Sequence, residues 1–241
     1  MGEQYEKEQE RLHVNLLLSA LEKGHLDEFR EEFLDLHPYD QAQFFSKLEE
    51  EERLKVFHYL SPEEMAVLFE NLEIEDDEYE ELLAEMNPTY AADMLSEMYA
   101  DDAVDVLNEL DKEQVVTYLT IMDDEAAQEI RELLHYEEYT AGSIMTTEFI
   151  AISANQTVRS AMYILKKEAP SAETIYYLYV IDDDKKLVGV VSLRDLIVSD
   201  DDMMISEIMS DRVHSISVSE DQESVANTMK DYNFLALPVV D

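Results

Sequence analysis

Apolar residues recur at a fixed interval through the first half of the chain. When the sequence is divided into units of twelve beginning at His25, every twelfth position is Leu or Met. The ninth position is Phe or Leu in every unit except the last, where it is Arg131, and the only irregularity is an insertion of Glu73 and Ile74. The fifth, eighth, ninth and twelfth positions form one apolar stripe on an α-helix. The pattern therefore predicts one short amphipathic helix in each unit.

Polar caps and prolines mark where these helices begin. Ser61 and Asn87 each precede a proline, and Asp111 and Asp123 occupy the same place in later units. Proline recurs in alternate units, at positions 38, 62 and 88, which predicts a repeat of two helices and excludes one long coiled coil. Because helices of about ten residues are marginal alone, we expect these hairpins to stack into a curved all-α superhelical solenoid.

A different pattern begins after residue 140. Short apolar runs at 149–153, 174–182 and 187–193 predict strands, the amphipathic segment 157–169 predicts a helix, and a second helix should follow "GVVSL". A partial second copy comes next, because "IAISANQTV" returns as "ISVSEDQESV" and "YVID" returns as "PVVD". We therefore expect an α/β module of order βαββα, followed by a copy that is truncated at the end of this sequence.

The charge balance is strongly acidic. The chain has 17 basic and 58 acidic residues, a formal net charge of −41. A field of this sign repels nucleic acid and attracts cations, although acidity can also serve solubility alone. The absence of cysteine excludes disulfides and thiolate metal sites. No apolar run approaches the roughly 20 residues of a membrane span, and the N-terminus lacks the pattern of a signal peptide, so we expect this stretch to be soluble.

Two acidic side chains in "YADDAVDVLNEL" raise a specific question. Asp101 and Asp105 are four positions apart on a predicted helix, where like charges cost a few tenths of a kcal/mol. They could form an ordinary solvated helix face, or they could bind a cation that relieves their repulsion. Both interpretations are open at this stage.

The repeated α/β module resembles the cystathionine-β-synthase (CBS) domain through "GVVSLRD", residues 189–195. CBS domains pack as pairs and often bind adenine nucleotides. The resemblance implies that Ser192 lies near phosphate, that Asp195 accepts from ribose hydroxyls, and that Arg194 belongs to the same motif. Tyr177 and Phe234 could sandwich the base. As alternatives, Ser192 and Asp195 fit a helix capping box, and both aromatic residues could belong to the core.

The whole sequence resembles the cytosolic region of MgtE-type magnesium transporters and channels, in which an acidic helical domain runs into a CBS pair. The stretches "YEEYTAGSIMT", "ETIYYLYVID" and "GVVSLRDLIVSD" carry this resemblance. It implies a multidomain chain: a helical superhelix at 1–136, a first CBS domain with linker at 137–204, and an incomplete second CBS domain at 205–241.

The resemblance also implies a function. Mg²⁺ would bind between the domains and hold a compact, closed state, and its loss would open a membrane pore encoded outside this sequence. The implied location is the cytoplasmic face of the cell membrane, within a multi-pass full-length protein. The implied partners are that pore domain and a second copy, paired through the CBS domains, with no nucleic acid. Adenine nucleotide, ATP or another, is a further expected ligand.

The metal ligands that the resemblance implies are Asp101 and Asp105 in "DDAVD", and Asp221 and Glu223 in "EDQES". Asn233 stands where relatives often carry a metal-binding Asp, so that position should bind more weakly. An alternative of another class is a soluble scaffold whose CBS pair senses adenine nucleotides. An enzyme finds no nucleophile, base pair or phosphate loop in this sequence, and we expect none.

Overall fold

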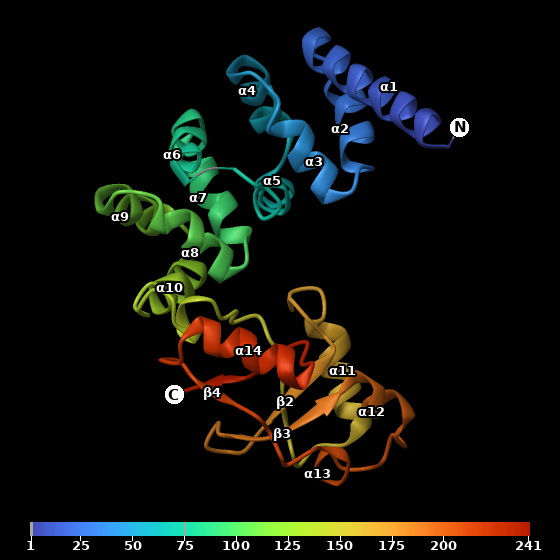
Figure 1. Ribbon diagram of the computed structural model, residues 1–241, viewed down its shortest axis with the longest axis vertical. Helices are drawn as coiled ribbons and strands as arrows, with labels where there is room; N and C mark the ends of the chain where they lie inside the picture. Colours follow the sequence, from blue (N-terminus) through green and yellow to red (C-terminus); the bar gives the residue numbers. More distant parts are fainter. Residues whose placement is uncertain (1, 75) are drawn as a thin grey trace. The chain divides into compact units, whose positions relative to one another are not determined.

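A computed structural model describes residues 2–74 and 76–241, with side chains from residue 12 onward except 75–77 (Figure 1). The chain divides into two compact units. The first comprises the chain up to Met98 together with Asp102–Gln128, and the second comprises Tyr99–Asp101 together with Glu129–Asp241.

In the described chain before residue 134, all regular secondary structure is helical. Their bounds are α1 Gly2–Lys23, α2 Leu26–Leu34, α3 Pro38–Phe45, α4 Glu50–Tyr59, α5 Pro62–Phe69, α6 Asp76–Glu85, α7 Pro88–Glu97, α8 Ala100–Asn108, α9 Lys112–Ile121 and α10 Asp124–Leu133. From α2 onward, each predicted unit of twelve holds one helix, as the apolar pattern indicates. The longer α1 precedes the first repeat and was not predicted.

The helices that begin with proline, and α9 after them, pack in succession: α3 on α5, α5 on α7, and α7 on α9. This is the contact between neighbouring two-helix repeats that a solenoid requires. At the N-terminal end, α1 packs against α2 and α4 and covers the first repeat. The predicted superhelical stack of short helices is confirmed.

The ninth position of each repeat supplies the core. Every apolar residue there is buried: Phe33, Phe45, Phe57, Phe69, Leu83, Leu95, Leu107 and Leu119. In several repeats the twelfth position closes the helix, because its backbone N–H donates to the carbonyl of the ninth residue, for example Leu48 to Phe45 at 3.0 Å. The repeat therefore fixes the buried side chain and the end of the helix together.

The predicted helix starts also form as expected. Ser61 Oγ accepts from the backbone N–H of Glu64, and Asn87 Oδ1 accepts from that of Thr89. Asp111 makes the same kind of cap at the start of α9. Each cap satisfies donors that have no partner inside the helix.

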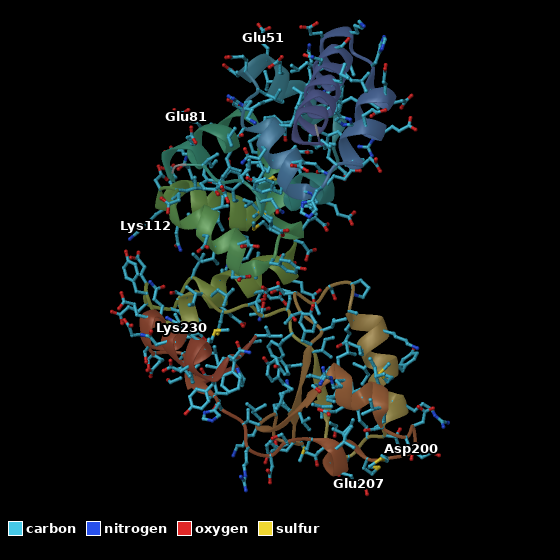
Figure 2. The ribbon with its side chains drawn as sticks, turned by 45° about the vertical axis from the view of Figure 1, so that its right-hand side comes forward. Glu51, Glu81, Lys112, Asp200, Glu207 and Lys230 are labelled. Atoms are coloured by element: carbon cyan, nitrogen blue, oxygen red, sulfur yellow. The ribbon has the colours of Figure 1, made fainter. Side chains whose placement is uncertain are left out.

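Scarce basic residues in the first unit join helices far apart in sequence. Arg30 donates two bonds of 2.7 Å to the carboxylate of Glu64, and Arg53 forms the same fork with Glu85. Burial alone would raise the pKa of Glu64, but the fork from Arg30 outweighs it and the pKa is lowered. Glu51 and Glu81, by contrast, are exposed and project outward (Figure 2).

A three-stranded sheet organises the first α/β copy. Its strands are β1 Ala151–Ser153, β2 Tyr177–Ile181 and β3 Leu187–Ser192, with β1 parallel and β3 antiparallel to β2. Helices α11 Val158–Glu168 and α12 Leu193–Val198 complete the order βαββα. The predicted strand and helix positions are confirmed, with shorter ends. Leu178 and Val180 face the buried core of this copy.

The second copy begins at the short helix α13, Ile205–Ile208. It continues with β4 Ile216–Ser217, α14 Gln222–Tyr232 and β5 Val239–Val240. β4 pairs in parallel with β5, as β1 does with β2. The 3₁₀ turn η1, Ala141–Ser143, lies beside it, because Ala141 and Gly142 donate to the carbonyls of Glu220 and Val218 at 2.7 and 2.9 Å. The segment leading into the first copy is thus bonded to the second.

A helix both long enough and apolar enough to cross a bilayer does not occur among the described residues.

The helical core predicts a clear stability difference. Phe45 is buried against the rings of Phe57 and Phe69, so Phe45→Ala should lower the free energy of unfolding by about 3–5 kcal/mol. Urea denaturation followed by circular dichroism measures this. Val116→Ala on the exposed face of α9 is the control and should change the free energy by less than about 0.5 kcal/mol. Equal effects of the two variants would contradict this assignment of the core.

Candidate metal and nucleotide sites

The first predicted acidic pair lies at the start of α8. Ala103, Val104, Val106 and Leu107 bury the apolar face of this helix, which leaves Asp101 half-buried and Asp105 exposed. The Oδ1 atom of Asp101 is shielded from solvent. The two aspartates are one helical turn apart, as the sequence predicts, so their carboxylates share one side of α8.

The environment of Asp105 disfavours its charge. Packing around the part of the side chain that is not exposed excludes water and raises its pKa above the usual range. Because folding raises this pKa, the charged carboxylate opposes folding at pH values above the folded pKa. The penalty disappears as the pH falls toward the unfolded pKa. A bound cation would remove the same penalty at neutral pH.

The second predicted acidic pair lies at the start of α14. Asp221 is the N-cap of this helix, and its Oδ1 accepts from the backbone N–H groups of Glu223 and Ser224 at 3.0 and 3.3 Å. Asp221 also forms a β-bridge with Thr140. Glu223 follows in the first turn and is exposed. Asp221 therefore has a structural role that its place before a helix could have revealed.

The four predicted metal ligands are not gathered into one cluster. In the part of the chain that the structure describes, no group of three or more His, Asp or Glu side chains is arranged to hold a metal ion. Asp101, Asp221 and Glu223 belong to the same compact unit, whereas Asp105 belongs to the other. Binding of Mg²⁺ at these residues stays a prediction.

Asn233 is the position at which weaker metal binding is expected. It ends α14 with a left-handed backbone at φ 54°. Its N–H donates to the carbonyl of Lys230, and the next N–H, of Phe234, donates to Met229. Asn adopts this conformation more readily than most residues. The left-handed backbone is therefore a structural reason for Asn at this position.

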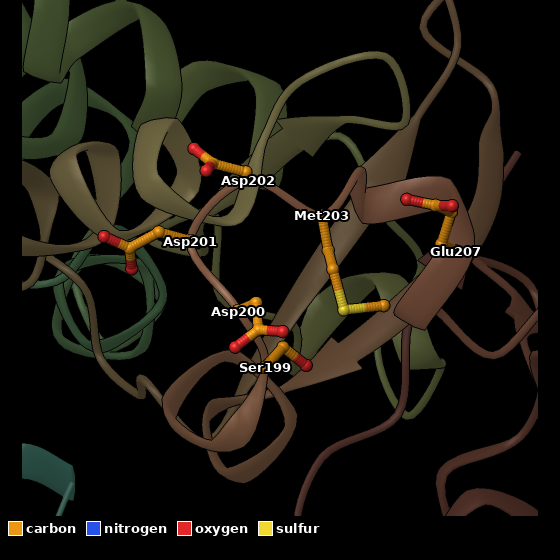
Figure 3. A pocket seen from close by; sticks show the side chains of 6 residues that line it. All are labelled: Ser199, Asp200, Asp201, Asp202, Met203 and Glu207. Atoms are coloured by element: carbon orange, nitrogen blue, oxygen red, sulfur yellow. The ribbon is translucent and has the colours of Figure 1, made fainter.

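An open acidic depression lies at the linker between α12 and α13, lined by Ser199, Asp200, Asp201, Asp202, Met203 and Glu207 (Figure 3). Three of its four carboxylates have local partners. Arg159 pairs with Asp201 and Asp202 at 3.3 and 3.1 Å, and Glu207 accepts from the backbone N–H of Met204. These bonds connect the linker to α11 and fix the start of α13. They give most of the acidic residues in the depression a structural role that needs no ligand.

The nucleotide motif of the first copy is assembled at one end of the β2–β3 hairpin. Tyr177 and Ser192 are paired across the two strands, and Arg194 and Asp195 follow in the first turn of α12. Ser192 Oγ donates to the Asp195 carboxylate at 2.5 Å and accepts from its backbone N–H at 3.1 Å. The capping interpretation of this pair is therefore realised in the structure, and nucleotide binding by it remains a prediction.

Phe234 lies in a different environment, in the second copy. Its ring stacks on Tyr232 with centroids 5.4 Å apart, and His214 lies 5.6 Å from it. The ring contacts of Phe234 in the described residues do not include Tyr177. The proposed stacking of a base between these two rings is untested.

One contact that the sequence did not suggest ends at the acidic helix. The backbone N–H of Ala100, the first residue of α8, donates to Oε1 of Glu148 at 3.0 Å. The two residues are 48 positions apart and both belong to the second unit. No local sequence pattern signals a cap at that separation.

Comparisons with known proteins place the two parts of the chain. Residues 36–139 match the MgtE intracellular N domain, and residues 141–201 and 205–241 each match a CBS domain. The magnesium transporter MgtE of Enterococcus faecalis is 62% identical over 226 residues, which are 94% of this chain and 50% of that protein. That of Thermus thermophilus is 37% identical over 97% of this chain and 52% of its own length. The chain thus spans about half the length of these curated relatives.

Two solved structures match nearly the whole chain. One is the soluble part of a magnesium transporter, with a TM-score of 0.93 and 56% identity over 96% of this chain and 91% of the other. The second is the cytosolic domain of the Mg²⁺ channel MgtE in complex with ATP, with a TM-score of 0.87 and 35% identity over 95% and 92%. With an MgtE N domain followed by CBS domains and this agreement in fold, the chain belongs to the MgtE family of magnesium transporters.

Proposed function

We propose that this chain is the Mg²⁺-sensing regulatory region of an MgtE-type magnesium transporter or channel. Mg²⁺ bound at acidic faces of the helical and CBS domains holds a compact, closed state, and its loss opens the membrane pore. The pore domain lies outside the sequence described, and the chain is not an enzyme. The observation that carries the proposal is the carboxylate pair of α8, which the buried face of the helix holds one turn apart in a chain whose fold matches the cytosolic domain of a Mg²⁺ channel.

The chemistry of the ion suits this surface. Mg²⁺ prefers oxygen ligands, keeps several waters and usually takes one or two carboxylates from a protein. An ion that bridges Asp101 and Asp105 to Asp221 and Glu223 neutralises charges that otherwise repel. A site with a Kd of about 1 mM contributes about 4 kcal/mol at the standard state. Several such sites, occupied only in the compact state, shift a two-state equilibrium.

The same proposal includes a nucleotide, location and partners. ATP or another adenine nucleotide binds the CBS pair, with Ser192, Arg194 and Asp195 at ribose and phosphate and with Tyr177 and Phe234 at the base. A solved relative in complex with ATP supports this. The chain lies at the cytoplasmic face of the cell membrane as part of a multi-pass protein.

A homodimer through the CBS domains is also part of the proposal. The support for it is on α12, where Ile197 and Val198 are 65% and 74% exposed. Apolar side chains this exposed on one short helix are stabilised when a second copy covers them.

The acidic pair of α8 gives the main test. In the parent chain, millimolar Mg²⁺ should slow cleavage by protease between the domains. Asp101→Ala combined with Asp105→Ala should move the Mg²⁺ midpoint of this protection upward by roughly tenfold, equivalent to about 1.4 kcal/mol. The control is Asp183→Ala with Asp184→Ala in the exposed β2–β3 turn, which removes the same charge. Limited proteolysis across a Mg²⁺ titration provides the midpoints.

An unchanged midpoint in the double variant of α8 would contradict the role of these residues. If protection follows ATP and is indifferent to Mg²⁺, the alternative of a soluble scaffold that senses adenine nucleotide is favoured instead.

Two variants of Asp221 distinguish helix capping from metal binding. Asp221→Asn keeps an oxygen that can cap α14, so the free energy of unfolding without Mg²⁺ should change by less than about 0.5 kcal/mol, whereas Asp221→Ala should lower it by about 1 kcal/mol. Both variants should weaken the Mg²⁺ response, because both remove the charge. Thermal unfolding with and without Mg²⁺ measures both effects. A response that only Asp221→Ala weakens would assign Asp221 to capping alone.

A further inference from the structure

Glu148 joins the first CBS copy to the beginning of the acidic helix. Its Oε1 atom accepts from the backbone N–H of Ala100 at 3.0 Å. The first four N–H groups of a helix have no partner within the helix, and a negative charge there is stabilised by the helix dipole. Glu148 therefore does for α8 what Asp111 and Asp123 do for the next two helices, but from a distant part of the sequence.

The carboxylate of Glu148 is held in place by its own loop. Its other oxygen, Oε2, accepts from Thr146 Oγ1 at 2.8 Å and from the N–H and Oγ1 of Thr147 at 3.1 and 3.2 Å. Its backbone N–H donates to Thr146 Oγ1. With three donors on one oxygen, the side chain is ordered, so the bond to Ala100 forms at little further cost in conformational entropy.

The loop is in turn fixed to the core of the first copy. The carbonyl of Glu148 accepts from the N–H of Glu173 at 3.0 Å. Two residues further, Ile150 is buried in the core, and its carbonyl accepts from the N–H of Tyr179 in β2. A continuous set of bonds therefore runs from the sheet through Glu148 to Ala100, the residue before Asp101.

We propose that Glu148 is a positioning residue that fixes the first turn of α8 to the CBS sheet, and that it thereby sets the Mg²⁺ response of Asp101. This inference rests on the proposed function. Without Glu148, the first turn loses its external acceptor, and the repulsion among the acidic residues there favours fraying. Asp105, one turn further along, is held by the buried face of α8 and depends less on Glu148.

Hydrogen exchange without Mg²⁺ tests the cap directly. In Glu148→Ala, the amide of Ala100 should exchange roughly fivefold faster than in the parent chain, the loss expected for one hydrogen bond. Glu148→Gln retains one acceptor oxygen, for which the N–H groups of Ala100 and Thr147 compete, so its increase should be smaller than that of Glu148→Ala. Glu138→Gln, at an exposed position of the same unit, removes a charge as Glu148→Gln does and should leave this amide unchanged.

The Mg²⁺ midpoint of protease protection tests the positioning role. Glu148→Ala should raise it several-fold, and Glu148→Gln should partly restore it. Thr146→Val with Thr147→Val removes two donors to Oε2 and leaves the carboxylate in place, so it should shift exchange and midpoint in the same direction by less. This second variant decides the question if Glu148→Ala does not fold.

Unchanged exchange at Ala100 in Glu148→Ala, or in the threonine variant if that is the one that folds, would overturn the proposal. Faster exchange with an unchanged Mg²⁺ midpoint would also overturn it, since Glu148 would then only stabilise the fold. A parent chain that does not respond to Mg²⁺ at all would refute the proposed function and the positioning role together, while exchange measured without Mg²⁺ would still show whether Glu148 caps α8.

Discussion

Repulsion between carboxylates held close together by a helix is the interaction on which this account depends. The buried face of α8 fixes the backbone of Asp101 and Asp105 one helical turn apart. Partial removal of water raises the pKa of Asp105, which shows that its charge is costly to the fold. A group that is costly when bare and satisfied by a divalent ion makes stability depend on the concentration of that ion.

The scaffold tolerates this cost because its stability comes from elsewhere. The repeat buries one large apolar side chain in nearly every helix, and proline, Ser, Asn and Asp caps fix where the helices begin. Forks from Arg30 and Arg53 neutralise the partly buried Glu64 and Glu85, and many other carboxylates among the described side chains are exposed to solvent, where screening limits their repulsion. A formal charge of −41 is thus compatible with a folded chain.

Apolar patterns in the sequence predicted the helices and strands whose positions depend on neighbouring residues. The twelve-residue period located the helices from α2 onward, and short apolar runs located β1 to β3, because burial of a stripe or a strand decides both. α1 was missed because it lies outside the repeat. The hydrogen bond from Ala100 to Glu148 could not be predicted from the sequence, since it joins residues 48 positions apart and depends on tertiary folding. The cap by Asp221 could be anticipated from its place before a helix, because Asp is a common N-cap residue.

Small-angle X-ray scattering of the intact chain in Mg²⁺, and in Na⁺ at matched ionic strength, distinguishes bridging of carboxylates from screening of their charges. Screening acts equally in both salts, whereas bridging of carboxylates requires the divalent ion. The account predicts that the radius of gyration falls in millimolar Mg²⁺ and stays at its metal-free value in Na⁺. The same radius in both salts at every concentration would contradict it.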